Sequence, residues 1–257
     1  MLKKKRQKKK FKTIGKSMVT HLSDFFGTKN AESLHHFRIQ VKKIKALLFF
    51  LQDEKSKTEG LSSLRSIFKH AGQIRAAQIN LGLLKAYHVN DVSYKVELEH
   101  IERDEIERFF AKRNAYTRIV KLAGKVLSKK FQNVGDKHLV RLYRKQLKKL
   151  SRFFNQPGEP IEKWHETRKK IKNLLYLYRI LPKSLVHKLH LNDAYLDQLQ
   201  EAIGKWHDIV LILELLKSEG YAKKGGMATI HLKKRSLYHS IQMLSHDFEH
   251  KVEPITT

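Results

Sequence analysis

Apolar residues recur at every third or fourth position along almost the whole chain, with polar residues between them. This spacing places the apolar side chains on one face of an α-helix. The pattern predicts helices at residues 11–27, 30–52, 61–88, 94–128, 137–154, 161–181, 190–217 and 229–251. With 12 Gly and 4 Pro in 257 residues, the chain is also poor in turn formers, which favours an all-α fold.

The predicted helices are separated by residues that stop or cap helices. Gly27–Asn30 ends one helix and offers a cap for the next, and Pro157–Pro160 separates two others. Pro182 stops a further helix, since it cannot donate the next backbone hydrogen bond. Gly220 and Gly225-Gly226 bracket a loop before the last helix.

The helices fall into two sets of four, joined by a linker near Ser128–Lys137. Phe25-Phe26 in the first set corresponds to Phe153-Phe154 in the second. Because four amphipathic helices with short loops suit an antiparallel bundle, the pattern predicts two four-helix bundles related by a pseudo-two-fold axis. The predicted divisions are a disordered basic arm at residues 1–10, a first half at 11–128 and a second half at 129–257.

Charge narrows the possible partners. Lys and Arg number 53 against 25 Asp and Glu, which gives a formal net charge of +28. Repulsion among so many like charges favours binding to an anionic partner, which would relieve it. The 41% of apolar residues supply a core, and the lack of Cys excludes thiolate metal sites and Cys nucleophiles. No apolar run is long enough for a membrane span or a secretory signal, so we expect a cytoplasmic protein without a membrane partner.

One cationic motif occurs in both halves. His-x-x-Arg-x-x-x-Lys begins at His35 and again at His165, each time in a predicted helix. On a helix these side chains share an arc of roughly 80° that borders the apolar face. Their stems would pack on apolar surface while their charges face an anion. The residues of this stripe are His35, Arg38, Lys42, Lys45, His165, Arg168 and Lys172.

Two further patterns accompany the motif. Gly72-x-x-Arg75 in the first half corresponds to Gly204-x-x-His207 in the second, where Asp208 follows. Asp208 could orient the His207 ring, whereas the first half has Ala76 instead, so we expect asymmetric halves with tighter geometry in the second. A separate basic stripe also runs along the first helix of the second half, at Arg141, Arg144 and Lys148.

These motifs, in this order, resemble the CHAD family, the conserved histidine α-helical domain, over roughly residues 11–251. The family motif is similar to His-x-x-Arg-x-x-x-Arg/Lys-Arg/Lys-x-Arg. The first copy matches it throughout, including Lys43, whereas the second has Asn173 and Leu175 at positions where the family usually keeps cations. Ile203–Asp208 looks like the family's Leu-Gly-x-x-Arg/His-Asp motif.

The resemblance implies two helical bundles around a central basic channel that binds inorganic polyphosphate. It implies a role in localisation to, or regulation at, polyphosphate stores such as cytoplasmic granules, with no catalytic residue, cofactor or metal. The expected polyphosphate-binding residues are His35, Arg38, Lys42, Lys43, Lys45, Arg75, Arg141, Arg144, Lys148, His165, Arg168, Lys172 and His207, with Asp208 beside them. A nearby polyanion should favour the protonated form of His35, His165 and His207, so affinity should rise as pH falls through about 6.5.

Two alternative functions remain open from the residues. The order of His165, His207-Asp208 and Asp247 is that of metal-dependent HD-type phosphohydrolases, although the cation Arg168 on the face of His165 would repel a metal. His246 and His250, one turn apart, form a weaker candidate metal pair.

The second alternative is unspecific nucleic-acid binding, which the charge alone would support. Single-strand binders stack bases on exposed aromatic rings. The most conspicuous rings lie in apolar helical stripes, which predicts that they belong to the core. They are Phe37, Phe49, Phe50, Phe109 and Phe110.

Overall fold

The computed structural model describes residues 1–51, 59–87, 92–128, 133–156, 161–218 and 227–253. Within these ranges the regular secondary structure is α-helical, apart from an isolated antiparallel bridge between Leu2 and Val134. The predicted all-α class is therefore confirmed. The chain divides into two compact units, which we call the first unit (residues 2–134) and the second unit (residues 135–257 with Met1). The division falls a few residues beyond the predicted one.

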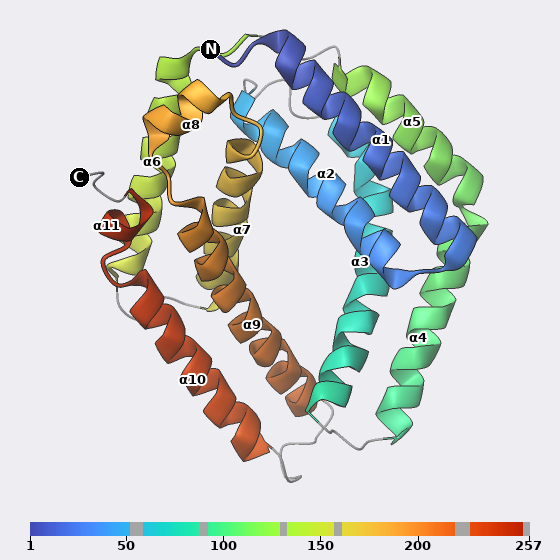
Figure 1. Ribbon diagram of the computed structural model, residues 1–257. Helices are drawn as coiled ribbons and strands as arrows, with labels where there is room; N and C mark the ends of the chain where they lie inside the picture. Colours follow the sequence, from blue (N-terminus) through green and yellow to red (C-terminus); the bar gives the residue numbers. More distant parts are fainter. Residues whose placement is uncertain (52–58, 88–91, 129–132, 157–160, 219–226, 254–257) are drawn as a thin grey trace. The chain divides into compact units, whose positions relative to one another are not determined.

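The described part of the first unit contains five helices. They are α1 (Lys4–Thr28), α2 (Ala31–Leu51), α3 (Glu59–Ala86), α4 (Val92–Ala111) and α5 (Arg113–Ser128). Helix α1 packs against α2 and α5, while α3 packs against α2, α4 and α5 (Figure 1). The core of this unit lies between the facing apolar stripes, such as Phe11, Ile14, Met18, Leu22 and Phe25 of α1.

The second unit contains α6 (Asp136–Phe154), α7 (Ile161–Tyr178), α8 (Lys183–Leu189), α9 (Asp193–Ser218), α10 (Met227–Ser245) and α11 (Phe248–Val252). Helix α7 packs against α6 and α9, and α9 packs against α10 and α11 (Figure 1). Helix α6 buries Leu139, Tyr143, Leu147 and Leu150 at successive turns, and the Tyr143 hydroxyl donates a 3.0 Å hydrogen bond to the Leu174 carbonyl of α7.

The packed pairs correspond between the units. The contacts of α1 with α2, α2 with α3, and α3 with α4 correspond to those of α6 with α7, α7 with α9, and α9 with α10. The paired phenylalanines also correspond. The ring centre of Phe26 lies 5.5 Å from that of Phe109, near the end of α4, and the ring centre of Phe154 lies 4.9 Å from that of Phe248, at the start of α11. The sequence repeat thus has a counterpart in the order of helix packing.

The cap between α1 and α2 forms where the sequence placed it. The backbone of Lys29, not of Gly27, takes the left-handed conformation, with φ at 56°. The side-chain oxygen of Asn30 accepts a 2.8 Å hydrogen bond from the backbone nitrogen of Glu32. This bond satisfies one of the unpaired donors at the start of α2.

The prediction of a disordered arm over residues 1–10 is wrong. Helix α1 begins at Lys4, and Leu2 and Gln7 are buried. Leu2 exchanges backbone hydrogen bonds with Val134, and the backbone nitrogen of Lys4 donates to the side chain of Asn133 at 2.7 Å. These contacts order a segment whose composition alone favours disorder.

Two predicted helices are each divided in the structure, and one further helix appears between two predicted ones. The predicted helix 94–128 breaks at Lys112, with no Gly or Pro to mark the break. The break allows α4 to pack on α3 while α5 packs on both α1 and α3. The last predicted helix breaks near Asp247, whose φ is 52°, and the short helix α8 was not predicted.

No helix in the described ranges combines the length and apolarity needed to span a membrane.

Candidate functional site

In the first unit, the Arg38 side chain extends from α2 onto the backbone of α3. Its Nη1 atom donates a 2.6 Å hydrogen bond to the carbonyl oxygen of Phe68, and its guanidinium carbon lies 4.4 Å from the centre of the Phe68 ring. Gly72 lies one turn further along α3. A Cβ atom at that position would stand 2.6 Å from Arg38 Nη1. Gly72 therefore provides the space that the guanidinium occupies.

The second unit repeats this arrangement with different neighbours. Arg168 of α7 donates through Nε to the carbonyl oxygen of Gln200 in α9, at 3.1 Å. A Cβ atom at Gly204 would stand 2.7 Å from Arg168 Nη2 and 2.9 Å from both Nε and the guanidinium carbon. In each unit the accepting carbonyl lies one helical turn before the glycine. We call this arrangement the arginine clamp.

The clamp explains why the sequence pairs the two motifs. A guanidinium can lie against a helix backbone only where the helix lacks a Cβ atom, so the glycine and the arginine are needed together. Each hydrogen bond uses one of the five N–H donors of an arginine and leaves the others for an anion. The clamp also holds the side chain in one orientation, which lowers the entropy lost on binding.

In the second unit, a pair of histidine rings lies beside the clamp. The centres of the His165 and His207 rings are 4.4 Å apart, with 40° between their planes. Burial, His207 and two nearby cations lower the pKa of His165 to about 4. Burial also lowers the pKa of His207, whereas Asp208 acts to raise it. The Nδ1 atoms of both rings are buried and make no hydrogen bond among the described residues.

The first unit places an arginine where the second has His207. Burial and the charge of Arg75 lower the pKa of His35 to about 4. Burial and Arg75 also lower the pKa of Arg38. The Nε atom of Arg75 is buried and lacks a hydrogen-bond partner within the described ranges. Both units therefore hold half-buried cations and histidines that repel one another.

Lysines extend each cluster along the same helix face. The Nζ atom of Lys45 lies 4.2 Å from the centre of the Phe68 ring, and burial, Arg38 and Arg65 lower its pKa. The charge of Lys42, which lies two helical turns beyond His35 on α2, acts to lower the pKa of His35. In the second unit, burial and Arg168 lower the pKa of Lys172, and these effects are opposed by Asp197 and Glu201.

The other predicted site residues lie elsewhere. The charge of Lys43 acts to lower the pKa of His21 on α1. The basic stripe of α6 is exposed and lies away from the buried face of that helix. The residues of this stripe are Arg141, Arg144 and Lys148.

Geometry does not favour the metal-dependent alternative. Within the described ranges, no group of three His, Asp or Glu side chains is arranged to hold a metal ion. Asp247 is exposed and pairs with the neighbouring His246 at 2.9 Å. The charge of Arg168 acts on His165, as the sequence indicated, and so does the charge of Lys169.

Comparisons with known proteins agree with the motifs. The sequence matches the CHAD domain family over residues 15–217. The chain belongs to the CHAD domain family. The crystal structure of the CHAD domain from the plant Ricinus communis is similar in fold, with a TM-score of 0.62 over 96% of this chain and 89% of that chain. Sequence identity with that structure is 14%. No curated protein sequence matches this chain.

Sequence reasoning missed several residues of this CHAD domain's site. It quoted Gly72 and Gly204 as motif positions without assigning them a role, and it did not single out Phe68, Arg65 or the Gln200 carbonyl. A signal for Phe68 was available, because a residue one turn before the glycine lies on the same face of α3. The clamp's backbone acceptors had no sequence signal, since any residue supplies a carbonyl.

The arrangement suits binding of an anion with several charges. Each cluster offers arginine and lysine donors with few acidic neighbours, and burial makes their mutual repulsion stronger. An anion would relieve that repulsion and pair with the remaining donors.

Proposed function

We propose that this CHAD domain binds inorganic polyphosphate through the His–Arg–Lys clusters of both units. The observation that supports this most is the arginine clamp, which holds Arg38 and Arg168 half-buried in equivalent positions. A surface cation that served only for solubility would not need a glycine opposite it.

Phosphate polymers fit the chemistry of these clusters. Arginine presents a planar set of donors that matches phosphate oxygens, and lysine adds compact positive charge. The neutral histidines can take up protons when an anion binds. Because His35 and His165 have pKa values of about 4 in the free protein, the rise in affinity on acidification should extend well below the 6.5 expected from sequence.

We further propose that the domain binds its ligand without hydrolysing it. The clusters supply positive charge and neutral rings, which can bind a polyphosphate without activating a water molecule. Incubation with long-chain polyphosphate and Mg²⁺, followed by gel analysis of chain length, tests this point. Shortening of the polymer that is lost in the Arg38→Ala/Arg168→Ala variant would contradict it.

The deciding experiment is calorimetric titration of long-chain polyphosphate at two salt concentrations, with single-stranded DNA of matched charge as competitor. We expect tight binding that the DNA does not displace. If six to ten phosphates are neutralised, affinity should fall steeply with salt. In a plot of log affinity against log salt concentration, each phosphate contact should contribute roughly 0.7 to the downward slope. Equal affinity for DNA, with the same salt dependence, would instead mean unspecific binding by net charge.

The Arg38→Ala/Arg168→Ala variant then locates the site. A matched control replaces Arg103 and Arg235, which are exposed on α4 and α10, and so removes the same charge. We expect the clamp variant to lose most of its affinity and the control to keep it. Circular dichroism checks that both remain folded. Equal affinities would place the polyphosphate site elsewhere.

The expectation that both clusters border one central channel stays a prediction. If one polymer engages both, affinity should rise sharply once the polyphosphate is long enough to reach the second cluster. Titration with polyphosphates of graded length measures this.

A further inference from the structure

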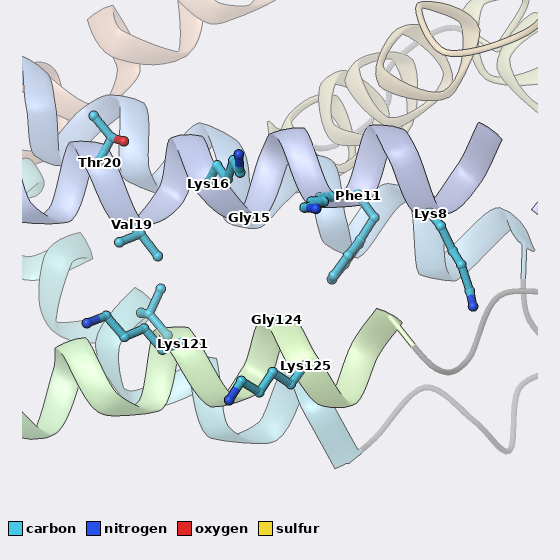
Figure 2. Close-up of a pocket in the computed structure, with 11 residues that line it drawn as sticks. Lys8, Phe11, Gly15, Lys16, Val19, Thr20, Lys121, Gly124 and Lys125 are labelled. Carbon is cyan, nitrogen blue, oxygen red and sulfur yellow. The ribbon is translucent and has the colours of Figure 1, made fainter. Parts of the chain in front are cut away.

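A long groove runs between α1 and α5 of the first unit, separate from the arginine clamp. Its larger part is a cavity of about 800 Å³. Figure 2 shows Phe11 and Val19 of α1 directed toward α5, with Gly15 and Gly124 opposite each other on the two helices. The floor is therefore apolar, and at both glycines the helices lack side chains.

A second cavity, of about 530 Å³, continues the groove toward the other end of the two helices. It shares Lys121 with the first cavity and reaches Phe26 on α1 and Arg113 on α5. From Lys8 to Phe26 the groove follows α1 for roughly 27 Å. An occupant of this length corresponds to about five turns of a helix.

The glycines make the floor unusually open. A Cβ atom added at Gly15 or at Gly124 would meet nothing within 4 Å. These glycines are therefore unlike Gly72 and Gly204, where a clamped arginine fills the space. Small residues at a groove allow the backbone of an incoming helix to approach closely, and such a groove suits the apolar face of an amphipathic helix.

The α5 rim of the groove is cationic along its whole length, and the α1 rim is cationic from Lys8 to Lys16. Lys8, Lys12 and Lys16 follow one another at single-turn spacing on α1, and Lys121 and Lys125 do so on α5. Arg113 and Arg118 continue the second rim. No residue that lines either cavity is acidic, and α5 contains no acidic residue.

We propose that this groove docks an acidic amphipathic helix of a partner protein, with its apolar face on the floor and its carboxylates against the two lysine rims. Charge complementarity selects this occupant. A polyphosphate chain has charge along its length but no apolar face for the floor. A single-stranded nucleic acid would need exposed rings on which its bases could stack, whereas Phe11 is buried. A lipid has an apolar chain, but its charge lies at one end, whereas the cations here are spread over the full groove.

The test uses a fluorescein-labelled peptide of about 18 residues, long enough to follow the groove. It carries Leu and Ala along one helical face and Glu along both borders, and a scrambled peptide of the same composition is the comparison. Fluorescence anisotropy with the full chain should show saturable binding of the first peptide. Binding of the scrambled peptide should be at least about tenfold weaker, because it cannot present the apolar face and the carboxylates together.

Variants of the groove locate the bound peptide. Gly15→Leu should fill the floor and weaken binding by about tenfold, and it should remain folded because Leu favours a helix more than Gly does. Lys12→Glu/Lys16→Glu should weaken binding similarly. The control Lys5→Glu/Lys9→Glu changes the net charge by the same amount, at exposed positions of α1 outside the groove. We expect this control to bind the peptide normally.

The outcomes separate this proposal from the polyphosphate function. Arg38→Ala/Arg168→Ala should bind the peptide normally, and polyphosphate should not displace it. Absence of saturable binding, equal affinity for the scrambled peptide, or normal binding by Gly15→Leu would overturn the proposal. A vesicle experiment could overturn the proposal as well. If Gly15→Leu abolished binding to phosphatidylglycerol vesicles but left peptide binding intact, the occupant of the groove would be a lipid surface.

Discussion

The two units build the same clamp in different electrostatic surroundings. In the first unit, Arg38 is repelled by Arg75, and Lys45 is repelled by Arg38 and Arg65. In the second unit, a histidine pair replaces the arginine, and Asp197 and Glu201 partly offset the repulsion on Lys172. The repeat has thus kept the geometry that positions one arginine while the charge around it has changed.

This difference assigns different contributions to the two units. The first unit should supply more of the affinity, because its cations have fewer acidic neighbours. The second should supply more of the pH dependence, because it contributes two rings with lowered pKa values where the first contributes His35. The sequence expectation of tighter geometry in the second unit, beside Asp208, is a separate matter and stays a prediction.

The largest expected effect is on affinity when one clamp is removed. Arg38→Ala should weaken polyphosphate binding by about 10- to 100-fold, the loss typical of charge-assisted hydrogen bonds. Arg168→Ala should weaken it less, because its neighbours include acidic residues. Calorimetry at one salt concentration measures both. Equal losses would contradict the difference between the units.

The next effect concerns stability. Ala at Gly204 should destabilise the protein by about 1–3 kcal/mol, since a methyl group would displace the clamped guanidinium. Gly72→Ala should cost less, because fewer atoms of Arg38 lie within 3 Å of the added Cβ. Urea unfolding measures both.

A matched control for these variants lies in α3 itself. A Cβ atom at Gly82 would meet nothing within 4 Å, so Gly82→Ala should stabilise the protein by about 0.5–1 kcal/mol through helix propensity. If all three variants were stabilised alike, the clamp would not need its glycine.

The pH dependence of stability tests the histidines. Below about 6.5 the unfolded chain binds protons at His35 and His165, whereas the folded chain holds them neutral down to about 4. The melting temperature of the free protein should therefore fall as pH falls across this window. His165→Gln/His207→Gln should flatten the fall more than His35→Gln does.

Polyphosphate should reverse that trend, because an anion favours the protonated rings. The stabilisation that it provides should be greater at pH 5 than at pH 7.5, when compared at one polymer concentration. A stabilisation independent of pH would exclude the histidines from the site.

The smallest effect is expected for the exposed stripe of α6. Replacing Arg141, Arg144 and Lys148 with Ala should reduce affinity by no more than about threefold, since exposed ion pairs contribute little. If all three side chains instead contacted phosphates, the variant's plot of log affinity against log salt concentration would be less steep by about 2. Titrations at several salt concentrations distinguish the two results.

Much of the fold could be predicted because it depends on local pattern. Apolar spacing gave the helix type, and the repeated motifs led to the family that the comparison confirmed. The break at Lys112 could not be predicted, because it arises from packing: Phe109 contacts Phe25, His70 and Tyr116 from three other helices. Phe49, which we assigned to the core, is 50% exposed, and the side chain of Phe50 lies outside the described residues.

By itself, the sequence determined which residues share a helix face, and therefore that His35, Arg38 and Lys42 lie on one face of a helix, as do His165, Arg168 and Lys172. Only the tertiary structure decided what those faces meet. The clamp depends on a carbonyl and a missing Cβ in another helix, and neither leaves a periodic signal. The groove between α1 and α5 depends on two helices distant in sequence, so the pattern along either helix alone did not reveal it.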